Sequence, residues 1–329
     1  MADYKTLKGF KVNSLASDPT VDKGQLWFNT TSSTLKYDTI ASGAWASGGA
    51  LNTGRNQAVT SGNATAATIG GGAIGPAPTS KSETYDGTAW TEVNDINTGR
   101  KKAGGRGTNT ACFIAGGTTA VPGAQTALTE IWNGTCWTEV NDLNTTKYGC
   151  TGTGTTTAGL ITGDSQSEEG ETEEFNGTCW AEVNNMIAGR SDTQGNGTQT
   201  ASFIAGGSPE GSSPPLAPTG QKMELYNGTC WTEDADLTHP RVSGAAAGTT
   251  TSAMIYGGYD STASPTSTVN VQEWNGTGWT EIANVLTANI NTSGDGSTSN
   301  AIMAGGNGSV TTTETWSSGA AAVKTVTTS

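Results

Sequence analysis

The sequence predicts an all-β fold assembled from six copies of one four-stranded sheet. The first of two repeated markers is an apolar run that ends in a pair of small residues; the first glycine of each pair is Gly71, Gly116, Gly163, Gly206, Gly257 or Gly305. The second marker is a tryptophan, at Trp90, Trp137, Trp180, Trp231 and Trp279. Both markers recur every 43 to 51 residues and stay in step, so the units are repeats of one structure.

In each unit the first two strands are joined by a glycine turn. The first strand follows a basic residue, as in Arg100–Gly104. Nine residues before each glycine pair the chain has Gly62, Gly107, Gly154, Gly197, Gly248 or Gly296. A turn that needs positive φ explains glycine in all six units. The apolar run that follows, such as Cys112–Ala115, is typical of a strand covered on both faces.

The third and fourth strands form a hairpin. In the second unit these strands are Glu130–Trp132 and Trp137–Val140. Between them, Asn133-Gly134 is the strongest short hairpin signal, and Asp86-Gly87, Asn176-Gly177, Asn227-Gly228 and Asn275-Gly276 repeat it. One such sheet cannot bury both of its faces alone. We therefore expect six four-stranded sheets packed around an axis as the blades of a β-propeller.

A glycine pair, then an aromatic residue and, five residues later, a tryptophan form the kelch pattern. The chain has it as Tyr85 to Trp90, Trp132 to Trp137, Phe175 to Trp180, Tyr226 to Trp231 and Trp274 to Trp279. Segments like Trp45–Arg55 and an opening hairpin like Gly24–Asp38 add to the pattern. The chain thus resembles, over nearly its whole length, the kelch-like β-propeller repeat proteins of tailed bacteriophages. Such a pattern specifies a fold better than a function.

The resemblance implies a virion structural protein: a tail fibre, a tail or neck appendage, or a capsid decoration. Such a protein would be made in the host cytoplasm, sit in the virion in several copies and dock on other virion structural proteins. The alternative is a module that recognises a host-surface glycan through the propeller loops, because variable loops carry binding specificity. Those loops hold few aromatic residues, which favours assembly.

The two ends of the chain depart from the repeat. We expect residues 1–50 to form a hairpin segment that attaches the protein or closes the ring, and residues 51–329 to form the propeller. The attachment candidates are Trp27, Phe28, Tyr37 and Trp45. The same strands could instead supply a seventh, incomplete blade, although six blades are favoured. The last unit lacks both the Asn-Gly turn and the fourth-strand tryptophan, as expected of a cap or closing strand.

A basic residue recurs sixteen positions before the glycine pair. The positions are Arg55, Arg100, Lys147, Arg190 and Arg241, with Asn289 in the sixth unit. One interpretation is a ring of cations that holds an anionic glycan or a carboxylate. The other is a ring of structural pairs with backbone carbonyls or with fourth-strand glutamates, namely Glu92, Glu139, Glu182, Glu233 and Glu281. Closeness in the chain favours the structural pairs.

Charge and hydropathy argue against several classes of function. The formal net charge is −13, and an acidic protein repels phosphate, so we expect no nucleic-acid partner. No stretch approaches 18 apolar residues and the start lacks the apolar core of a signal peptide. We therefore expect no membrane insertion and no export by a cleaved signal. The five cysteines are expected to be free thiols in small core positions.

Enzymatic chemistry has few candidate residues. His239 is the only histidine, and no nucleophile-elbow pattern accompanies it. A metal site with several histidines is therefore impossible. The acidic run Glu168–Glu174 could supply the two carboxylates of a glycosidase but reads as a solvated charge run. We expect no enzyme, no catalytic residue, no metal and no cofactor.

Overall fold

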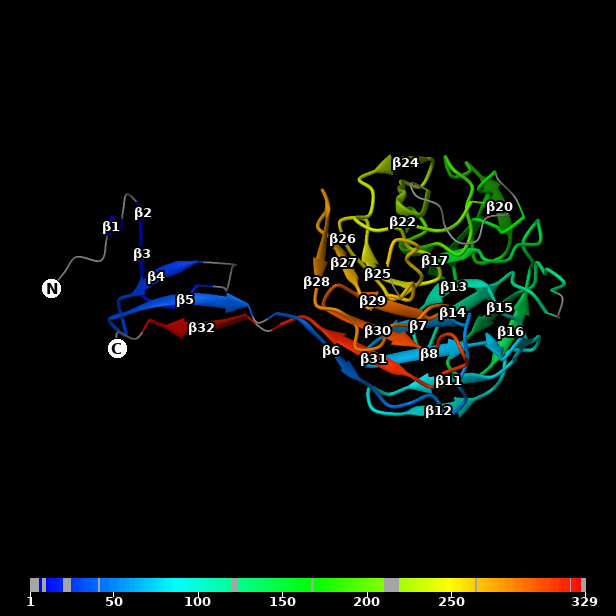
Figure 1. Cartoon of the computed structure of the whole chain (residues 1–329), viewed down its shortest axis with the longest axis horizontal. Coiled ribbons are helices and arrows are strands. Elements are labelled where there is room, and N and C mark those ends of the chain that lie inside the picture. Colours follow the sequence, from blue (N-terminus) through cyan, green and yellow to red (C-terminus); the bar gives the residue numbers. More distant parts are fainter. Residues whose placement is uncertain are drawn as a thin grey trace. The chain divides into compact units, whose positions relative to one another are not determined.

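The computed structural model describes residues 6–7, 10–19, 25–40, 42–119, 123–166, 169–209, 219–263, 265–319 and 321–326. These residues form β-strands and one 3₁₀ turn, η1 (Thr219–Gln221), and include no α-helix. The chain divides into two compact units (Figure 1). Unit 1 is Met1–Ala44 together with Ser318–Ser329, and unit 2 is Trp45–Ser317.

Unit 2 is built from four-stranded antiparallel sheets, six of them in its described part. The first is β7 (Val59–Asn63), β8 (Ala66–Gly70), β11 (Ser82–Tyr85) and β12 (Trp90–Val93). The second is β13 (Gly104–Gly107), β14 (Cys112–Ala115), β15 (Thr129–Trp132) and β16 (Trp137–Val140). The third is β17 (Thr151–Thr155), β18 (Ala158–Thr162), β19 (Thr172–Phe175) and β20 (Trp180–Val183).

The remaining sheets of unit 2 follow the same order. The fourth is β21 (Gln194–Thr198), β22 (Ala201–Ala205), β23 (Met223–Tyr226) and β24 (Trp231–Asp234). The fifth is β25 (Ala245–Thr249), β26 (Ser252–Tyr256), β27 (Val271–Trp274) and β28 (Trp279–Ile282). The sixth is β29 (Ser293–Ser297), β30 (Asn300–Ala304), β31 (Thr313–Ser317) and β6 (Ala44–Ser47). A short hairpin, β9 (Ala73–Ile74) with β10 (Ala77–Pro78), lies outside these sheets.

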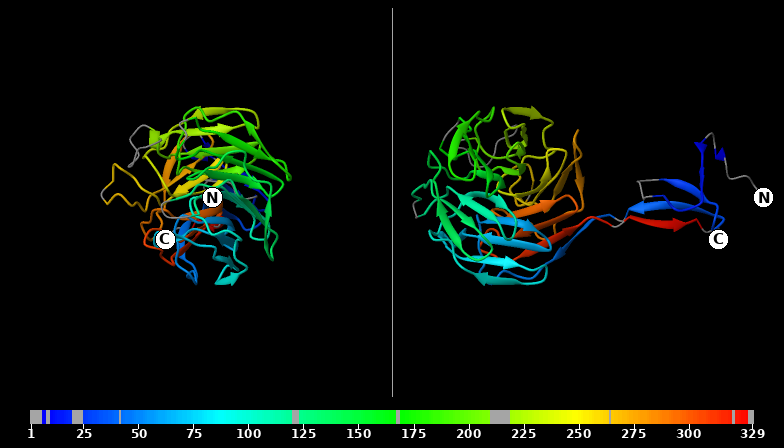
Figure 2. Two further views of the ribbon diagram at one scale, coloured as in Figure 1. Left: turned by 90° about the vertical axis from the view of Figure 1, so that its right-hand side faces the viewer. Right: turned by 180° about the vertical axis from the view of Figure 1, so that it is seen from behind.

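The first strands of successive sheets contact one another in a cycle, β7–β13–β17–β21–β25–β29 and back to β7. The sheets therefore fan out around an axis, and the architecture is all-β and propeller-like (Figure 2). The apolar core lies between neighbouring sheets. In one interface, Phe113 and Ala115 of the second sheet pack with Ile161, Phe175 and Trp180 of the third.

The glycines expected at turns have the backbone conformation that the turns require. All six turn glycines have positive φ, for example Gly107 at 142°. The first glycine of every small-residue pair is also positive, between 63° and 77°. A Cβ on Gly116 would lie 2.6 Å from the carbonyl oxygen of Lys147 in the next unit. Glycine at this position is thus required by conformation and by the close approach of two sheets.

The sixth sheet is completed by a strand from the other end of the chain. Strand β6 takes the fourth position beside β31, and Trp45 there lies 5.6 Å from Trp316 between ring centroids. The repeat places Trp90 in the same way, 5.0 Å from Tyr85. Trp45 therefore supplies the tryptophan that the last unit lacks. The boundary between the units lies at residues 44–45 and not at 50, and residues 318–329 group with the N-terminal segment.

Unit 1 contains a separate mixed sheet made from both chain ends. Its strand order is β3 (Asn13–Leu15), β4 (Leu26–Asn29), β5 (Thr34–Ile40) and β32 (Ala321–Thr325). β3 and β4 are parallel, and a short pair, β1 (Thr6–Leu7) and β2 (Phe10–Lys11), precedes them. The hairpin near residues 26–40 thus pairs with the C-terminal strand and does not supply strands to a further sheet of unit 2.

Candidate functional site

The five basic residues of the repeat are buried, each exposing at most 1% of its surface. Four of them form ion pairs. Arg100 Nη2 lies 3.0 Å from Glu130 Oε1, and Arg190 Nη1 lies 3.1 Å from Glu224 Oε1. Arg55 pairs with Glu83, and Lys147 pairs with Glu171 and Glu173. The charge of each of these four cations is balanced by a carboxylate inside the protein, which supports the interpretation as structural pairs. Hydrogen bonding is incomplete, since Nε and Nη1 of Arg100 and all three guanidinium nitrogens of Arg190 have no hydrogen-bond partner.

In the first four sheets one glutamate partner lies on the third strand (Glu83, Glu130, Glu173 or Glu224) and also holds the linker from the preceding sheet. Glu83 accepts hydrogen bonds from the backbone N–H groups of Asn52 (2.7 Å) and Thr53 (3.1 Å). Glu130, Glu173, Glu224 and Glu314 accept two linker N–H groups in the same way. The fourth-strand glutamates that the sequence suggested as partners are exposed. Pairing follows the sheet register and not closeness in the chain.

Two units break this pairing. The fifth unit keeps Arg241 but has Gln272 at the glutamate position, and the sixth keeps Glu314 but has Asn289 at the basic position. Arg241 donates from Nη1 to the Gly257 carbonyl at 3.1 Å, while its Nε and Nη2 have no hydrogen-bond partner. Burial lowers the pKa of Arg241 to about 10, against the opposing effect of Asp260 and Glu281. The fifth unit therefore holds a buried cation without its usual carboxylate.

A ring of six residues, most of them polar, lies around the axis of the sheets. The sequence did not predict this site. Two residues after each basic position stands a residue with φ between 52° and 67°: Gln57, Lys102, Gly149, Asp192, Ser243 and Asn291. The backbone N–H of each donates to the carbonyl of the preceding one at 2.7–3.0 Å, and Gln57 closes the cycle on Asn291. The signal was present in the sequence as a small or polar residue at one offset in all six units.

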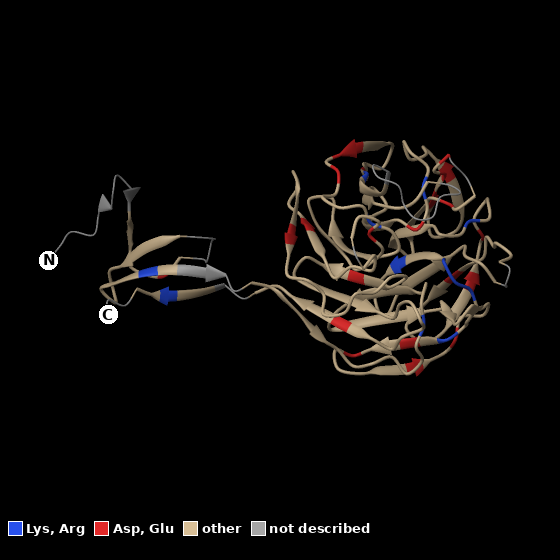
Figure 3. Cartoon of the chain, viewed as in Figure 1, with Lys and Arg blue, Asp and Glu red and all other residues tan. Residues whose placement is uncertain are grey.

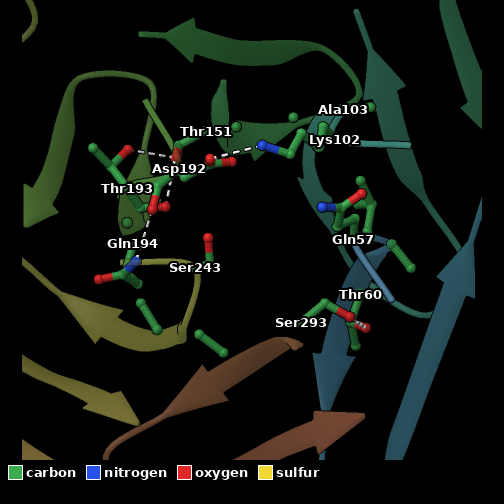
Figure 4. Close-up of a pocket in the computed structure, with 18 of the residues that line it drawn as sticks. Gln57, Thr60, Lys102, Ala103, Thr151, Asp192, Thr193, Gln194, Ser243 and Ser293 are labelled. Carbon is green, nitrogen blue, oxygen red and sulfur yellow. Dashed lines mark hydrogen bonds and ion pairs between the residues drawn. The ribbon is translucent and has the colours of Figure 1, made fainter. Parts of the chain in front are cut away.

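This cycle of residues surrounds a cavity of about 120 Å³ (Figure 4). Lys102 Nζ and Asp192 Oδ2 pair at 2.8 Å on one side of it, bridging past Gly149. Elsewhere on the wall, Gln57 Nε2 lies 3.4 Å from Asn291 Oδ1. Ser243 also lines the cavity. Further hydroxyl pairs on the wall are Thr60 with Ser293 and Thr151 with Thr193, each at 2.6 Å. The lining is polar, and each of its two cations has a paired anion: Lys102 pairs with Asp192, and Arg106 pairs with Asp295.

Further along the same strands, a buried network closes the axis. Arg106 Nη1 donates to the Gly294 carbonyl at 2.8 Å and lies 3.3 Å from Asp295 Oδ1. Asp295 also accepts from Asn196 Nδ2 at 2.9 Å and from the backbone N–H of Gly62 at 2.8 Å. Burial raises the pKa of Asp295, and Arg106 opposes that rise. These contacts join the first, second, fourth and sixth sheets across the axis, so the cavity has an inner end.

The attachment candidates do not form one cluster. Trp45 lies in unit 2 and is buried, whereas Trp27, Phe28 and Tyr37 lie in unit 1. The Trp27 side chain is buried and its indole N–H donates to Asp18 Oδ1 at 3.2 Å. Phe28 and Tyr37 are half-buried. Only these two aromatic residues of the predicted set remain accessible to a partner.

The residues weighed for catalysis have structural partners. His239 is partly exposed, with Nε2 3.3 Å from Glu281 Oε1. In the acidic run, Glu173 is buried against Lys147, and Glu174 accepts a hydrogen bond from the Tyr226 hydroxyl at 2.8 Å. The interpretation as a solvated run is therefore wrong for Glu173, while Glu168 lies outside the described residues. No group of three or more His, Cys, Asp or Glu side chains suited to a metal ion occurs within the described ranges.

The cysteines are all free thiols, as predicted, but only two occupy core positions. Cys112 and Cys150 are buried, and burial raises the pKa of each thiol to about 12. Cys136 and Cys179 are exposed and Cys230 is half-buried. The core expectation is wrong for these three because they follow the Asn-Gly hairpin turns at the outer ends of the sheets.

No protein-family model matches the chain, and no curated protein matches it either. Among the described residues there is also no helix with the length and apolar character needed to cross a membrane.

Proposed function

We propose that this chain is a non-enzymatic structural protein of a tailed-phage virion, in the form of a tail fibre, a tail or neck appendage or a capsid decoration. In this proposal the six sheets are the blades of a kelch-like propeller, and the protein acts by docking on other virion structural proteins in several copies per particle. The observation that carries the proposal is unit 1. Strands from both ends of the chain form a separate sheet there. A mechanical force on unit 1 is therefore transmitted to unit 2 through two segments of the chain.

The distribution of charge supports attachment through unit 1. Its residues include six lysines and four aspartates, so unit 1 has a net charge of +2. Because the whole chain has a net charge of −13, unit 2 has a net charge of −15. Figure 3 shows the acidic positions spread over the strands of unit 2. Copies of an acidic propeller repel one another and remain soluble. The basic unit is then the part suited to contact an assembly.

One face of the unit 1 sheet is suited to protein contact. Leu26 pairs with Tyr37 in the register, and Phe28 pairs with Leu35, so their side chains share a face. Leu26 exposes 41% of its surface, and Val326, whose N–H bonds to the Leu35 carbonyl, exposes 42%. The opposite face buries Trp27. Exposed apolar residues gathered on one face mark interaction surfaces.

Immunogold labelling of purified, gradient-banded particles tests the proposal. Several gold particles per virion at one location support it, and a chain found only in the soluble lysate contradicts it. In reconstitution, L26S/V326S should lower incorporation. The matched control is Ile187→Ser, which changes a residue of unit 2 that exposes 60% of its surface and should leave incorporation unchanged.

A second candidate function is recognition of a host-surface glycan. The observation that favours it is the polar, charge-balanced axial cavity. The uneven loops that the sequence suggested for this role fall partly outside the described residues, since 210–218 belong to the longest of them.

A further inference from the structure

We infer that the axial cavity bounded by Gln57, Lys102, Asp192, Ser243 and Asn291 binds one neutral sugar residue, at the non-reducing end of a glycan chain. The inference deepens the second candidate function and does not depend on the attachment of unit 1. It is argued from the size, the closure, the charge and the rigidity of the cavity.

Size and closure limit the ligand to a single ring. The cavity volume is about 120 Å³, well below the roughly 300–1,000 Å³ of pockets that hold drug-sized molecules. The Arg106–Asp295 network closes the inner end, so a polymer cannot thread along the axis. A chain can therefore present only its terminal residue.

The chemistry of the wall suits hydroxyl groups. Lys102 offers donors, Asp192 offers acceptors, and the amides of Gln57 and Asn291 offer both. A sugar hydroxyl both donates and accepts, so it can bond to each of these groups. Lys102 pairs with Asp192, and Arg106, the other cation on the wall, pairs with Asp295, so the charges at the cavity balance. The net charge of −15 on unit 2 further disfavours anionic sugars and phosphates.

The wall is also rigid before any ligand binds. Six backbone hydrogen bonds of 2.7–3.0 Å connect its residues in a cycle, so little conformational entropy is lost on binding. None of its lining residues is aromatic, and the contact area available for one sugar is small. Each site should therefore bind weakly, and several copies per particle would supply avidity.

Saturation-transfer NMR on the full-length chain tests this inference. The probes are methyl α-D-glucopyranoside, methyl α-D-mannopyranoside, methyl β-D-galactopyranoside and methyl N-acetyl-β-D-glucosaminide, with N-acetylneuraminate and inorganic phosphate as anionic probes. The free reducing sugars form a second arm, which separates a chain terminus from a free monosaccharide. We expect at least one neutral methyl glycoside to show saturable transfer and the anionic probes to show none.

Matched double variants locate the binding. K102A/D192A removes the charge pair of the cavity, whereas K81A/D95A removes an exposed pair (3.8 Å) outside it, and both leave the net charge unchanged. The cavity variant should weaken binding by about tenfold or more, since it removes charged hydrogen-bonding groups, and the control should not. Circular dichroism confirms that both variants are folded. Absence of transfer from every neutral sugar, equal transfer from the anions, or unchanged binding by folded K102A/D192A would overturn the inference.

Discussion

A buried glutamate is the residue on which the neighbouring sheets depend. Glu83 binds Arg55 and also two backbone N–H groups of the linker from the preceding sheet. Both side chains are buried, so each needs the other to offset the loss of water. The sequence identified the basic residue of this ion pair as a repeated position. The glutamate partner was assigned to the wrong strand, because strand register and not sequence distance decides which carboxylate approaches.

The first prediction concerns this pair. Glu83→Gln should lower the free energy of unfolding by about 3–5 kcal/mol, because it leaves Arg55 buried without a counter-charge. The shape of the side chain is kept, so packing loss does not explain the effect. Chemical denaturation followed by tryptophan fluorescence measures the change.

The fifth unit provides the matched reverse substitution. Gln272→Glu gives Arg241 the carboxylate that the other units have, and should stabilise the protein by about 1–3 kcal/mol. A neutral Glu83→Gln together with a destabilising Gln272→Glu would show that the buried pairs do not hold the sheets.

Among the elements, strand β6 has the largest effect on the fold. It brings residues 44–47 to the sixth sheet, whose other strands begin at Ser293. The four-strand repeat was predictable from local signals: glycine turns, Asn-Gly hairpins and an apolar second strand. Ring closure by residues 1–50 was one of the roles that the sequence left open, and the pairing of β6 with β31 agrees with it for residues 44–47. These local signals did not decide between the roles, because a closing contact between distant segments leaves no periodic signature.

Trp45→Ala tests the role of β6. Trp45 packs 4.8 Å from Tyr256 and 5.6 Å from Trp316, between ring centroids, so its loss should cost about 3–5 kcal/mol of unfolding free energy. Trp137→Ala, at the equivalent position of the second sheet, should cost a similar amount. An exposed attachment residue would change stability by less than about 0.5 kcal/mol, and that result would remove Trp45 from the core.

At the scale of the whole molecule, the chain is two units joined by two segments. Unit 1 is held partly by Asp18, which accepts from Trp27 and Asn29 and pairs with Lys36 at 2.8 Å. The hydrogen bonds from Lys36 and Asn29 lower the pKa of Asp18 below its usual 3.8. The stabilisation is therefore present above that value and is lost as the pH falls through the lowered pKa.

Hydrogen exchange measures whether the units unfold separately. Asp18→Ala should increase exchange in β4 and β5, and should leave β14 and β22 of unit 2 unchanged, because no contact of Asp18 extends beyond unit 1 among its described partners. Equal loss of protection in both units would mean that they unfold together.

The pH dependence of Asp18 can be followed by NMR. Acidification should shift the resonance of the Trp27 indole N–H in the parent chain, because that group donates to Asp18. The Trp90 indole N–H, which donates to the hydroxyl of Thr313, should not shift.

The sequence by itself determined the repeated four-stranded unit and its all-β class, because each turn glycine, hairpin dipeptide and apolar strand is a local signal. Gly107 and Asn133-Gly134, for example, predict their turn conformations without information from the rest of the chain. Only the tertiary structure decided what is non-local: the strand that completes the sixth sheet, the glutamate that meets Arg55, and the residues that surround the axial cavity. These depend on the register and closure of sheets far apart in sequence, which no single repeat encodes.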